Sequence, residues 1–164
     1  MNQIFFGNLL NVNMTTMSIF TITMCSYIIN ENFDTLDKWT HSKWHEASST
    51  FTLGQGKFKD EDNKNSLVTN ESARYYTMTT DFTPFSNNKN PVFLQYTVQN
   101  SQNIDCGGMY MKLYPKLESL SDVKGGESET PYNIMFGPDK CGSTSKVHFI
   151  LNFNTSNVQK NNDI

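Results

Sequence analysis

After residue 30 the sequence consists mainly of short runs in which apolar and polar residues alternate, separated by Gly, Pro and Asn. Such alternation is typical of strands with one buried face, and the separating residues are those that form turns. Signals for helices are almost absent from this part of the chain. The predicted strands are 39–44, 49–53, 73–82, 92–98, 109–114, 132–136 and 147–153. This spacing predicts an all-β sandwich, with a β-barrel as the alternative.

The charge balance excludes several classes of partner. The 164 residues contain 13 Lys and Arg against 16 Asp and Glu, which gives a net charge of −3, and neither sign forms a long block. A chain without a basic excess has no electrostatic attraction for nucleic acid or for an anionic membrane surface. No run of 18 apolar residues occurs, so the length rule predicts no membrane span. The length suits one domain or part of one.

The first 29 residues differ from the rest because no charged residue precedes Glu31. They contain an apolar run at 17–29, interrupted by Thr and Ser, but no basic residues before it. An apolar run of this kind is the central part of a secretory signal, whose usual basic start is missing here. We predict a signal peptide at 1–25 and a first folded strand at 27–33. The alternative is a first strand preceded by an extension.

Three cysteines are present: Cys25, Cys106 and Cys141. The first would be removed with the predicted signal peptide, leaving two cysteines in an oxidising compartment. A bond between these two would close a loop of about 35 residues and stabilise the fold by about 3–4 kcal/mol. The alternative is a pair of unrelated buried thiols.

Familiar catalytic patterns are missing from the sequence. The three histidines have no metal-ligand spacing, and there is no nucleophile elbow, P-loop or EF-hand. His148 lies in an alternating run, so we expect it on the sheet surface or in the core and not in a catalytic triad. No pair of carboxylates suited to glycoside hydrolysis stands out.

The richest segment for binding chemistry is the run at 109–114 with the residues that follow it. Tyr110 and Lys112 are two positions apart, so they project from the same face of a strand. Tyr132 begins the next predicted strand, and Asp139 lies in a predicted turn after Pro138. Tyrosine rings stack on sugars, and Lys and Asp hydrogen-bond to hydroxyl groups. The alternative is that these are ordinary sheet residues with a solvated lysine.

Two stretches here resemble the calreticulin and calnexin family, the lectin chaperones of the endoplasmic reticulum. They are Asn-Ile-Asp-Cys-Gly-Gly at 103–108 and Tyr-Asn-Ile-Met-Phe-Gly-Pro-Asp-Lys-Cys at 132–141, and weaker similarity extends from 33 to 164. The resemblance implies a legume-lectin-like (concanavalin A-like) antiparallel β-sandwich. It also implies that 26–164 is the N-terminal part of a lectin domain, without the family's proline-rich arm, its remaining strands and its acidic tail.

The same resemblance implies a function. Members of this family bind monoglucosylated high-mannose N-glycans on unfolded glycoproteins in the lumen of the endoplasmic reticulum, and they are not enzymes. Their arm, absent here, recruits a protein disulfide isomerase. The positions that match the glucose-contacting residues are Tyr110, Lys112, Tyr132, Met135 and Asp139, and those that match the family disulfide are Cys106 and Cys141.

The resemblance further implies a structural calcium ion as cofactor. The position that matches its first-strand ligand is Asn32, and the loop ligands fall near 63–66, where this sequence is one residue short. A later carboxylate ligand is absent, so we expect an incomplete site. Two other functions stay open: a secreted glycan hydrolase on the same fold, and a structural β-domain or inactive fragment that binds no sugar.

Two acceptor sequences for N-linked glycosylation are also present. They are Asn-Glu-Ser at 70–72 and Asn-Thr-Ser at 154–156. Such tripeptides arise by chance in a chain rich in asparagine, so the sequence does not decide whether either is used.

Overall fold

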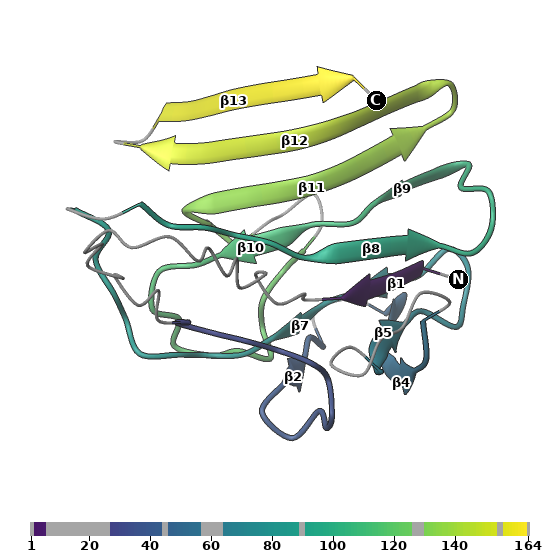
Figure 1. Cartoon of the computed structure of the whole chain (residues 1–164), viewed down its shortest axis with the longest axis horizontal. Helices are drawn as coiled ribbons and strands as arrows, with labels where there is room; N and C mark the ends of the chain where they lie inside the picture. The colour runs from purple at the N-terminus through teal and green to yellow at the C-terminus, as the bar shows by residue number, and fades with distance from the viewer. Residues whose placement is uncertain are drawn as a thin grey trace, which may run out of the picture.

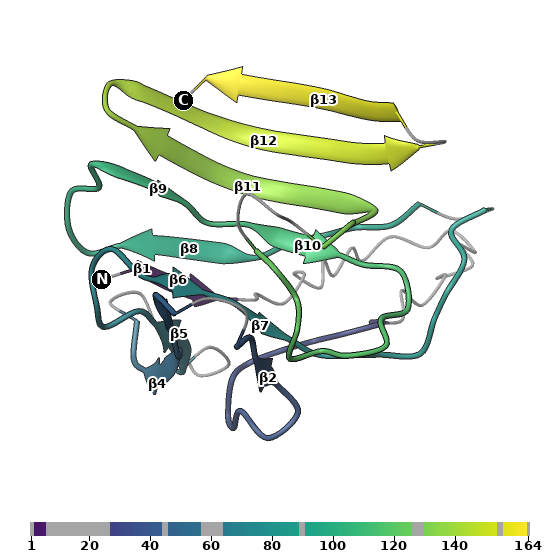
Figure 2. The same cartoon turned by 180° about the vertical axis from the view of Figure 1, so that it is seen from behind.

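The computed structural model describes residues 2–5, 27–43, 46–56, 64–88, 91–125, 130–153 and 156–163 (Figures 1 and 2). Their regular structure is entirely β, which confirms the predicted class. The described part contains no helix that could cross a membrane. The strands are β1 (Asn2–Phe5), β2 (Thr40–His41), β3 (Ser48–Ser49), β4 (Thr52–Gly54), β5 (Ser66–Val68), β6 (Tyr75–Tyr76), β7 (Met78–Thr79), β8 (Thr97–Asn100), β9 (Cys106–Gly108), β10 (Met111–Leu113), β11 (Ile134–Cys141), β12 (Thr144–Phe153) and β13 (Ser156–Asp163).

The largest sheet has the order β10-β11-β12-β13, and β9 pairs with β11 beyond the end of β10. All of its pairs are antiparallel. β11 and β12 form a hairpin in which eight residues of each strand are paired, from Ile134 opposite Leu151 to Cys141 opposite Thr144. In Figure 1 these long strands form one side of the molecule.

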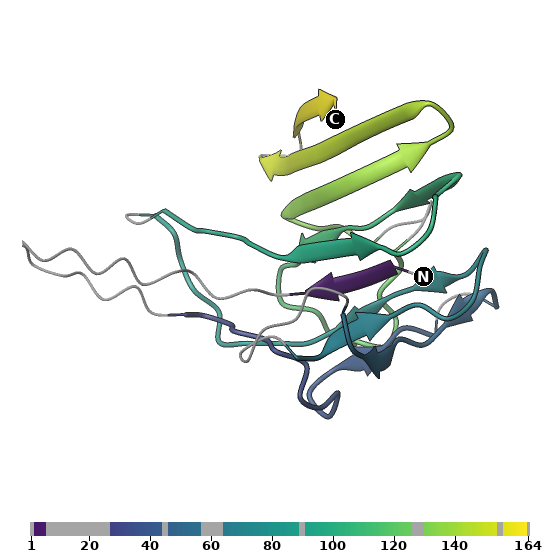
Figure 3. The same ribbon diagram turned by 45° about the vertical axis from the view of Figure 1, so that its right-hand side comes forward.

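A second sheet has the order β4-β5-β1-β8, also antiparallel. Two small pairs, β2 with β7 and β3 with β6, complete the described strands. In all three ribbon views β8 and β1 lie between the large sheet and the short strands β2, β4, β5 and β7 (Figures 1 to 3). The short strands therefore lie far from the β11–β12 hairpin.

The two sheets are stabilised by separate apolar clusters. Phe33, Phe51 and Leu67 are buried together beside the short strands. On the large sheet, Phe136 packs edge-on against Tyr96 and Phe149, with ring centroids 5.8 Å and 6.3 Å away. These three rings lie on one face of the large sheet, and the buried Met135 and Ile150 lie on the other, because successive side chains in a strand alternate between faces.

Several predicted boundaries differ from the structure. The segment 27–33 contains no strand. Phe33 has a left-handed backbone with a φ of +54°, and its N–H donates to the buried Glu31 carboxylate instead of to a neighbouring strand. The run at 92–98 is strand only from Thr97. β5 and β13 were not predicted. β1 falls within the predicted signal peptide, whose residues 6–25 lie outside the described ones, so that signal peptide stays a prediction.

Candidate saccharide-binding site

The register of the large sheet brings the predicted saccharide residues onto one face. Lys112 on β10 lies opposite Met135 on β11, and Asp139 on β11 lies opposite Gly108 on β9. Met135 and Asp139 are four positions apart, so they share a face, and Lys112 belongs to that face through its partner. The other face carries Phe136, whose ring packs against Tyr96 and Phe149.

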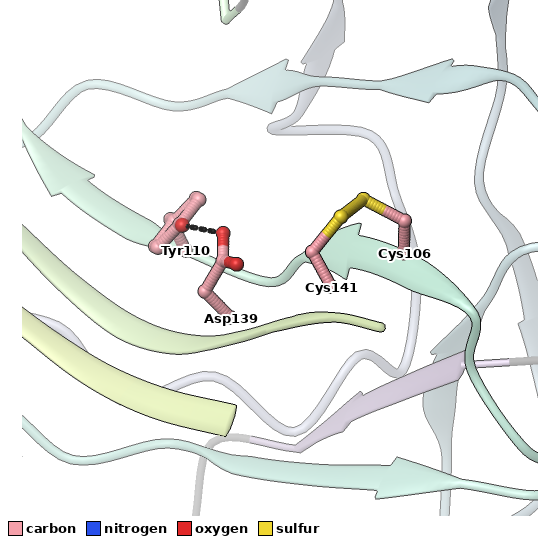
Figure 4. Close-up of a disulfide and its surroundings, with 4 residues drawn as sticks. All are labelled: Cys106, Tyr110, Asp139 and Cys141. Carbon is pink, nitrogen blue, oxygen red and sulfur yellow. Dashed lines mark hydrogen bonds between the residues drawn. A yellow bond between two sulfur atoms is a disulfide. The ribbon is translucent and has the colours of Figure 1, made fainter. Parts of the chain in front are cut away.

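Tyr110 and Asp139 are joined by a hydrogen bond that the tyrosine hydroxyl donates to the carboxylate. Figure 4 shows the two side chains turned toward each other from neighbouring segments. The prediction that Asp139 lies in a turn is wrong, because Asp139 is inside β11 and is paired on both sides, with Gly108 and with Lys146. A strand holds the carboxylate in a fixed direction, which suits directional recognition better than a turn does.

Lys112 and Tyr132 form the other half of the group. The Lys112 Nζ lies 5.0 Å from the centroid of the Tyr132 ring, within the range of a cation–π interaction. Tyr132 precedes β11, and its carbonyl oxygen accepts a hydrogen bond from the Asn152 side-chain amide on β12. Met135 is buried, with 8% of its surface exposed. The face thus combines an aromatic ring, a cation, a carboxylate and an apolar base.

A disulfide joins Cys106 to Cys141. The two residues are directly opposite each other on β9 and β11, with their Cα atoms 4.0 Å apart. Beside them, the Gly142 backbone N–H donates to the Asp105 carbonyl oxygen over 2.8 Å. The bond therefore ties β9 to β11 two residues beyond Asp139, as Figure 4 shows.

His148 is a member of this face that the sequence did not identify. It lies on β12 opposite Gly137, and its ring meets the Tyr110 ring edge-on, with centroids 6.0 Å apart. Neighbouring strands are about 4.8 Å apart, so residues two strands away normally stand about 10 Å apart. The side chains come closer here because Gly137, between them, carries none. Ile150, opposite Met135, extends the same face.

Comparison with known proteins shows the family of the chain. The sequence model of the calreticulin family matches residues 29–163. The chain belongs to the calreticulin family. It is 44% identical to calreticulin of Oryctolagus cuniculus over 130 residues, and 44% identical to calreticulin of Homo sapiens over 129 residues. These matches cover 78% and 77% of this chain and 30% of each relative, so the chain spans about a third of their length.

A solved calreticulin structure shares the fold. The globular domain of T. cruzi calreticulin superimposes with a TM-score of 0.69 at 32% identity, covering 84% of this chain and 52% of that one. This likeness, together with the helix-free structure, confirms the predicted lectin-type β-sandwich.

The predicted calcium ligand Asn32 and part of the predicted ligand loop are among the described residues. The Asn32 side-chain oxygen is buried and has no hydrogen-bond partner among the described residues. Calcium takes six to eight oxygen ligands, and an amide oxygen is one of the accepted types. Nearby, the Asn65 amide donates to the Asp34 carboxylate over 3.2 Å, which places the second half of the predicted ligand loop beside the 32–34 segment. No group of three His, Cys, Asp or Glu suited to a metal occurs in the described part. Asn32 therefore fits as one ligand, and the described residues do not complete the set.

Proposed function

We propose that this chain is the sugar-recognising part of a lectin chaperone that binds monoglucosylated N-glycans on folding glycoproteins in the lumen of the endoplasmic reticulum. The observation that carries the proposal is the face shared by Tyr110, Asp139, Lys112 and Tyr132, in a chain of the calreticulin family. A terminal glucose offers a flat apolar side and a ring of hydroxyl groups. Tyr110 and Tyr132 would contact the apolar side, while Asp139 and Lys112 bind hydroxyls.

The Tyr110–Asp139 hydrogen bond explains how the face is ready for a sugar. The tyrosine hydroxyl donates its one hydrogen to the carboxylate, and a hydroxyl oxygen is also an acceptor, the role that a sugar hydroxyl requires of it. The Tyr110–Asp139 hydrogen bond also fixes the direction of the carboxylate. The backbone of Asp139 is itself held by the pairing of β11 with β9 and by the Cys106–Cys141 disulfide. Groups that are already positioned lose less entropy when the ligand binds.

A pair of conservative variants tests this role by calorimetry with a glucose-terminated oligomannoside. Tyr110→Phe keeps the ring but removes the hydroxyl, so we expect it to bind the glycan more weakly. A hydrogen bond to a charged group is worth about 1.5–3 kcal/mol, which corresponds to a loss of about 10- to 100-fold in affinity. Tyr75→Phe makes the same change at an exposed tyrosine on β6 and is the control. If both variants bind the glycan as the unsubstituted chain does, the proposed site is wrong.

A glycan hydrolase on the same fold is the competing function. Glycoside hydrolysis needs two carboxyl groups that flank the scissile bond. Among the described side chains that β9 to β12 place on the saccharide face, Asp139 is the only carboxylate, and it is engaged by Tyr110. We therefore propose binding without catalysis. Release of glucose from the oligomannoside by the purified chain would contradict this.

Calcium enters the proposal as a structural ion with Asn32 among its ligands. The burial of Asn32 beside Phe33 ties such an ion to the core cluster and not to the saccharide face. Calcium would then raise the unfolding temperature of the chain, and Asn32→Ala would reduce that rise. An unfolding temperature that is unchanged by calcium would refute this part. The protein disulfide isomerase stays a prediction from the resemblance, since the residues involved belong to the arm.

A further inference from the structure

The loop between β5 and β6 presents the sequence Asn70-Glu71-Ser72 at the surface. All three residues are exposed. Asn-X-Ser is the acceptor sequence for N-linked glycosylation, and a folded protein tolerates a glycan only where the asparagine faces solvent. The acceptor at 154–156 begins in residues outside the described ones, so the structure provides an argument for Asn70 alone.

The loop that carries Asn70 is held at fixed points. The backbone N–H groups of Asn70 and Glu71 both donate to the Tyr76 hydroxyl, over 3.1 Å and 2.8 Å. The Glu71 carboxylate accepts from the Ser49 hydroxyl at 2.8 Å and from the Arg74 Nε at 3.1 Å. The loop is thus tied to β3 and to β6, which gives the Asn70 side chain a defined direction.

That direction is toward β4. The Asn70 Nδ2 donates to the Thr52 hydroxyl over 2.7 Å, and Thr52 begins β4. In the described sheet, β4 is an outer strand, paired with β5 on one side. Next to Thr52, Leu53 exposes 43% of its surface. An outer strand with an exposed leucine favours pairing with a strand of another molecule, and natural proteins usually cover or charge such edges.

We propose that Asn70 carries an N-linked glycan and that this glycan covers the β4 edge. The proposal rests on the lumenal location in the proposed function, because the transferase and its donor, a lipid-linked oligosaccharide pyrophosphate, act there. In the transfer, Nδ2 bonds to the anomeric carbon of the first sugar, and the bond from that carbon to the lipid pyrophosphate breaks. The pyrophosphate leaves with the bonding electrons, and Nδ2 loses one hydrogen as a proton to a base of the transferase. The second amide hydrogen remains, so the hydrogen bond to Thr52 can persist and hold the first sugar beside β4.

Translation of the full chain with microsomes, followed by glycosidase treatment, tests the modification. We expect a glycosidase-sensitive increase in mass that disappears in Asn70→Gln and Ser72→Ala. It should survive in Ser72→Thr, which keeps the hydroxyl of the acceptor, and in Asn154→Gln. The proposal is overturned if the chain is not imported, or if the imported chain and imported Asn70→Gln have the same glycan mass.

Sedimentation of the purified protein tests the covering of the edge. We expect the glycosylated chain to be monomeric, Asn70→Gln to self-associate, and the double variant Asn70→Gln with Leu53→Lys to be monomeric again, since lysine charges the edge. If Asn70→Gln stays monomeric at the same concentration, the proposal that the glycan covers the β4 edge is wrong. The affinity for a glucose-terminated oligomannoside should be the same whether or not Asn70 is glycosylated. A failure of the lectin function would therefore appear in calorimetry and leave the mass shift unchanged.

Discussion

Replacing Gly108 with alanine should weaken saccharide binding by moving the Tyr110 ring. A Cβ added at Gly108 would overlap the ring edge, lying 2.8 Å from the Tyr110 Cζ and 3.0 Å from its hydroxyl oxygen. These atoms are at the far end of a side chain that can rotate, so we expect the ring to swing away and the hydrogen bond to Asp139 to break. A hydrogen bond to a charged group contributes about 1.5–3 kcal/mol, which corresponds to about a 10- to 100-fold loss of affinity. The free energy of unfolding should fall by only about 1 kcal/mol, because the ring can move without opening the core.

The neighbouring glycine provides a matched control. A Cβ added at Gly107, on the same strand, meets one atom of the described residues, the Ile104 Cγ2 at 3.6 Å, in an ordinary van der Waals contact. Gly107→Ala should therefore bind within about twofold of the unsubstituted chain, as expected of a change below about 0.5 kcal/mol. Calorimetry with a glucose-terminated oligomannoside and urea unfolding on all three proteins make the comparison. Equal affinities for the two variants would refute the argument that the position of Tyr110 controls binding.

Three further predictions concern stability. Gly137→Ala should cost about 4 kcal/mol in urea unfolding, because Gly137 has a φ of +153° and its Cβ would overlap the Met109 carbonyl oxygen and the Tyr96 hydroxyl; an unchanged midpoint would contradict this. Burial raises the pKa of the Glu31 carboxyl, but hydrogen bonds from the Lys38 ammonium, the Phe33 backbone and the Trp39 indole outweigh it, so the pKa lies below its usual 4.5. As the pH falls, the carboxyl is protonated in the unfolded chain before it is protonated in the folded chain, so the free energy of unfolding should decrease below about pH 4.5. Glu31→Gln should make the free energy of unfolding less dependent on pH in this range, and should lower it by about 3 kcal/mol at pH 7. Peptide mapping without reductant should recover Cys106 linked to Cys141, and Cys141→Ser should lower the free energy of unfolding by about 3–4 kcal/mol; free thiols at both positions would contradict the structure.

The sequence predicts strands well where side chains alternate and poorly where neighbouring strands decide. The run at 147–153 alternates around Val, Phe and Leu, and it forms most of β12. β13 has the sequence Ser-Asn-Val-Gln-Lys-Asn-Asn-Asp, which lacks an apolar face, and it exists because eight of its residues pair with β12. The run at 92–98 shows the reverse case: it alternates, yet only its last two residues are strand, and Phe93 is 71% exposed.

In the candidate site, too, alternation along a strand could be predicted from the sequence, whereas features that depend on neighbouring strands could not. The two-residue spacing of Tyr110 and Lys112 suffices to predict a shared face, since alternation follows from strand geometry alone. Asp139 is predicted in a turn because Pro138 precedes it, whereas the pairing of β11 with both neighbours keeps it in the strand. His148 was missed because its contact with Tyr110 crosses two strands, and a single histidine in an alternating run carries no sign of such a neighbour.

The central claim is that the face around Tyr110 and Asp139 recognises a terminal glucose. The direct measurement is calorimetry of this chain, with its disulfide intact, against two oligomannosides that differ only in one terminal glucose. The account predicts binding of the glucosylated glycan that Asp139→Asn weakens by about 10-fold or more, since a charged acceptor becomes a neutral one, and much weaker binding of the glycan without glucose. Equal heats for the two glycans, or a glucose preference that survives in Asp139→Asn, would contradict it.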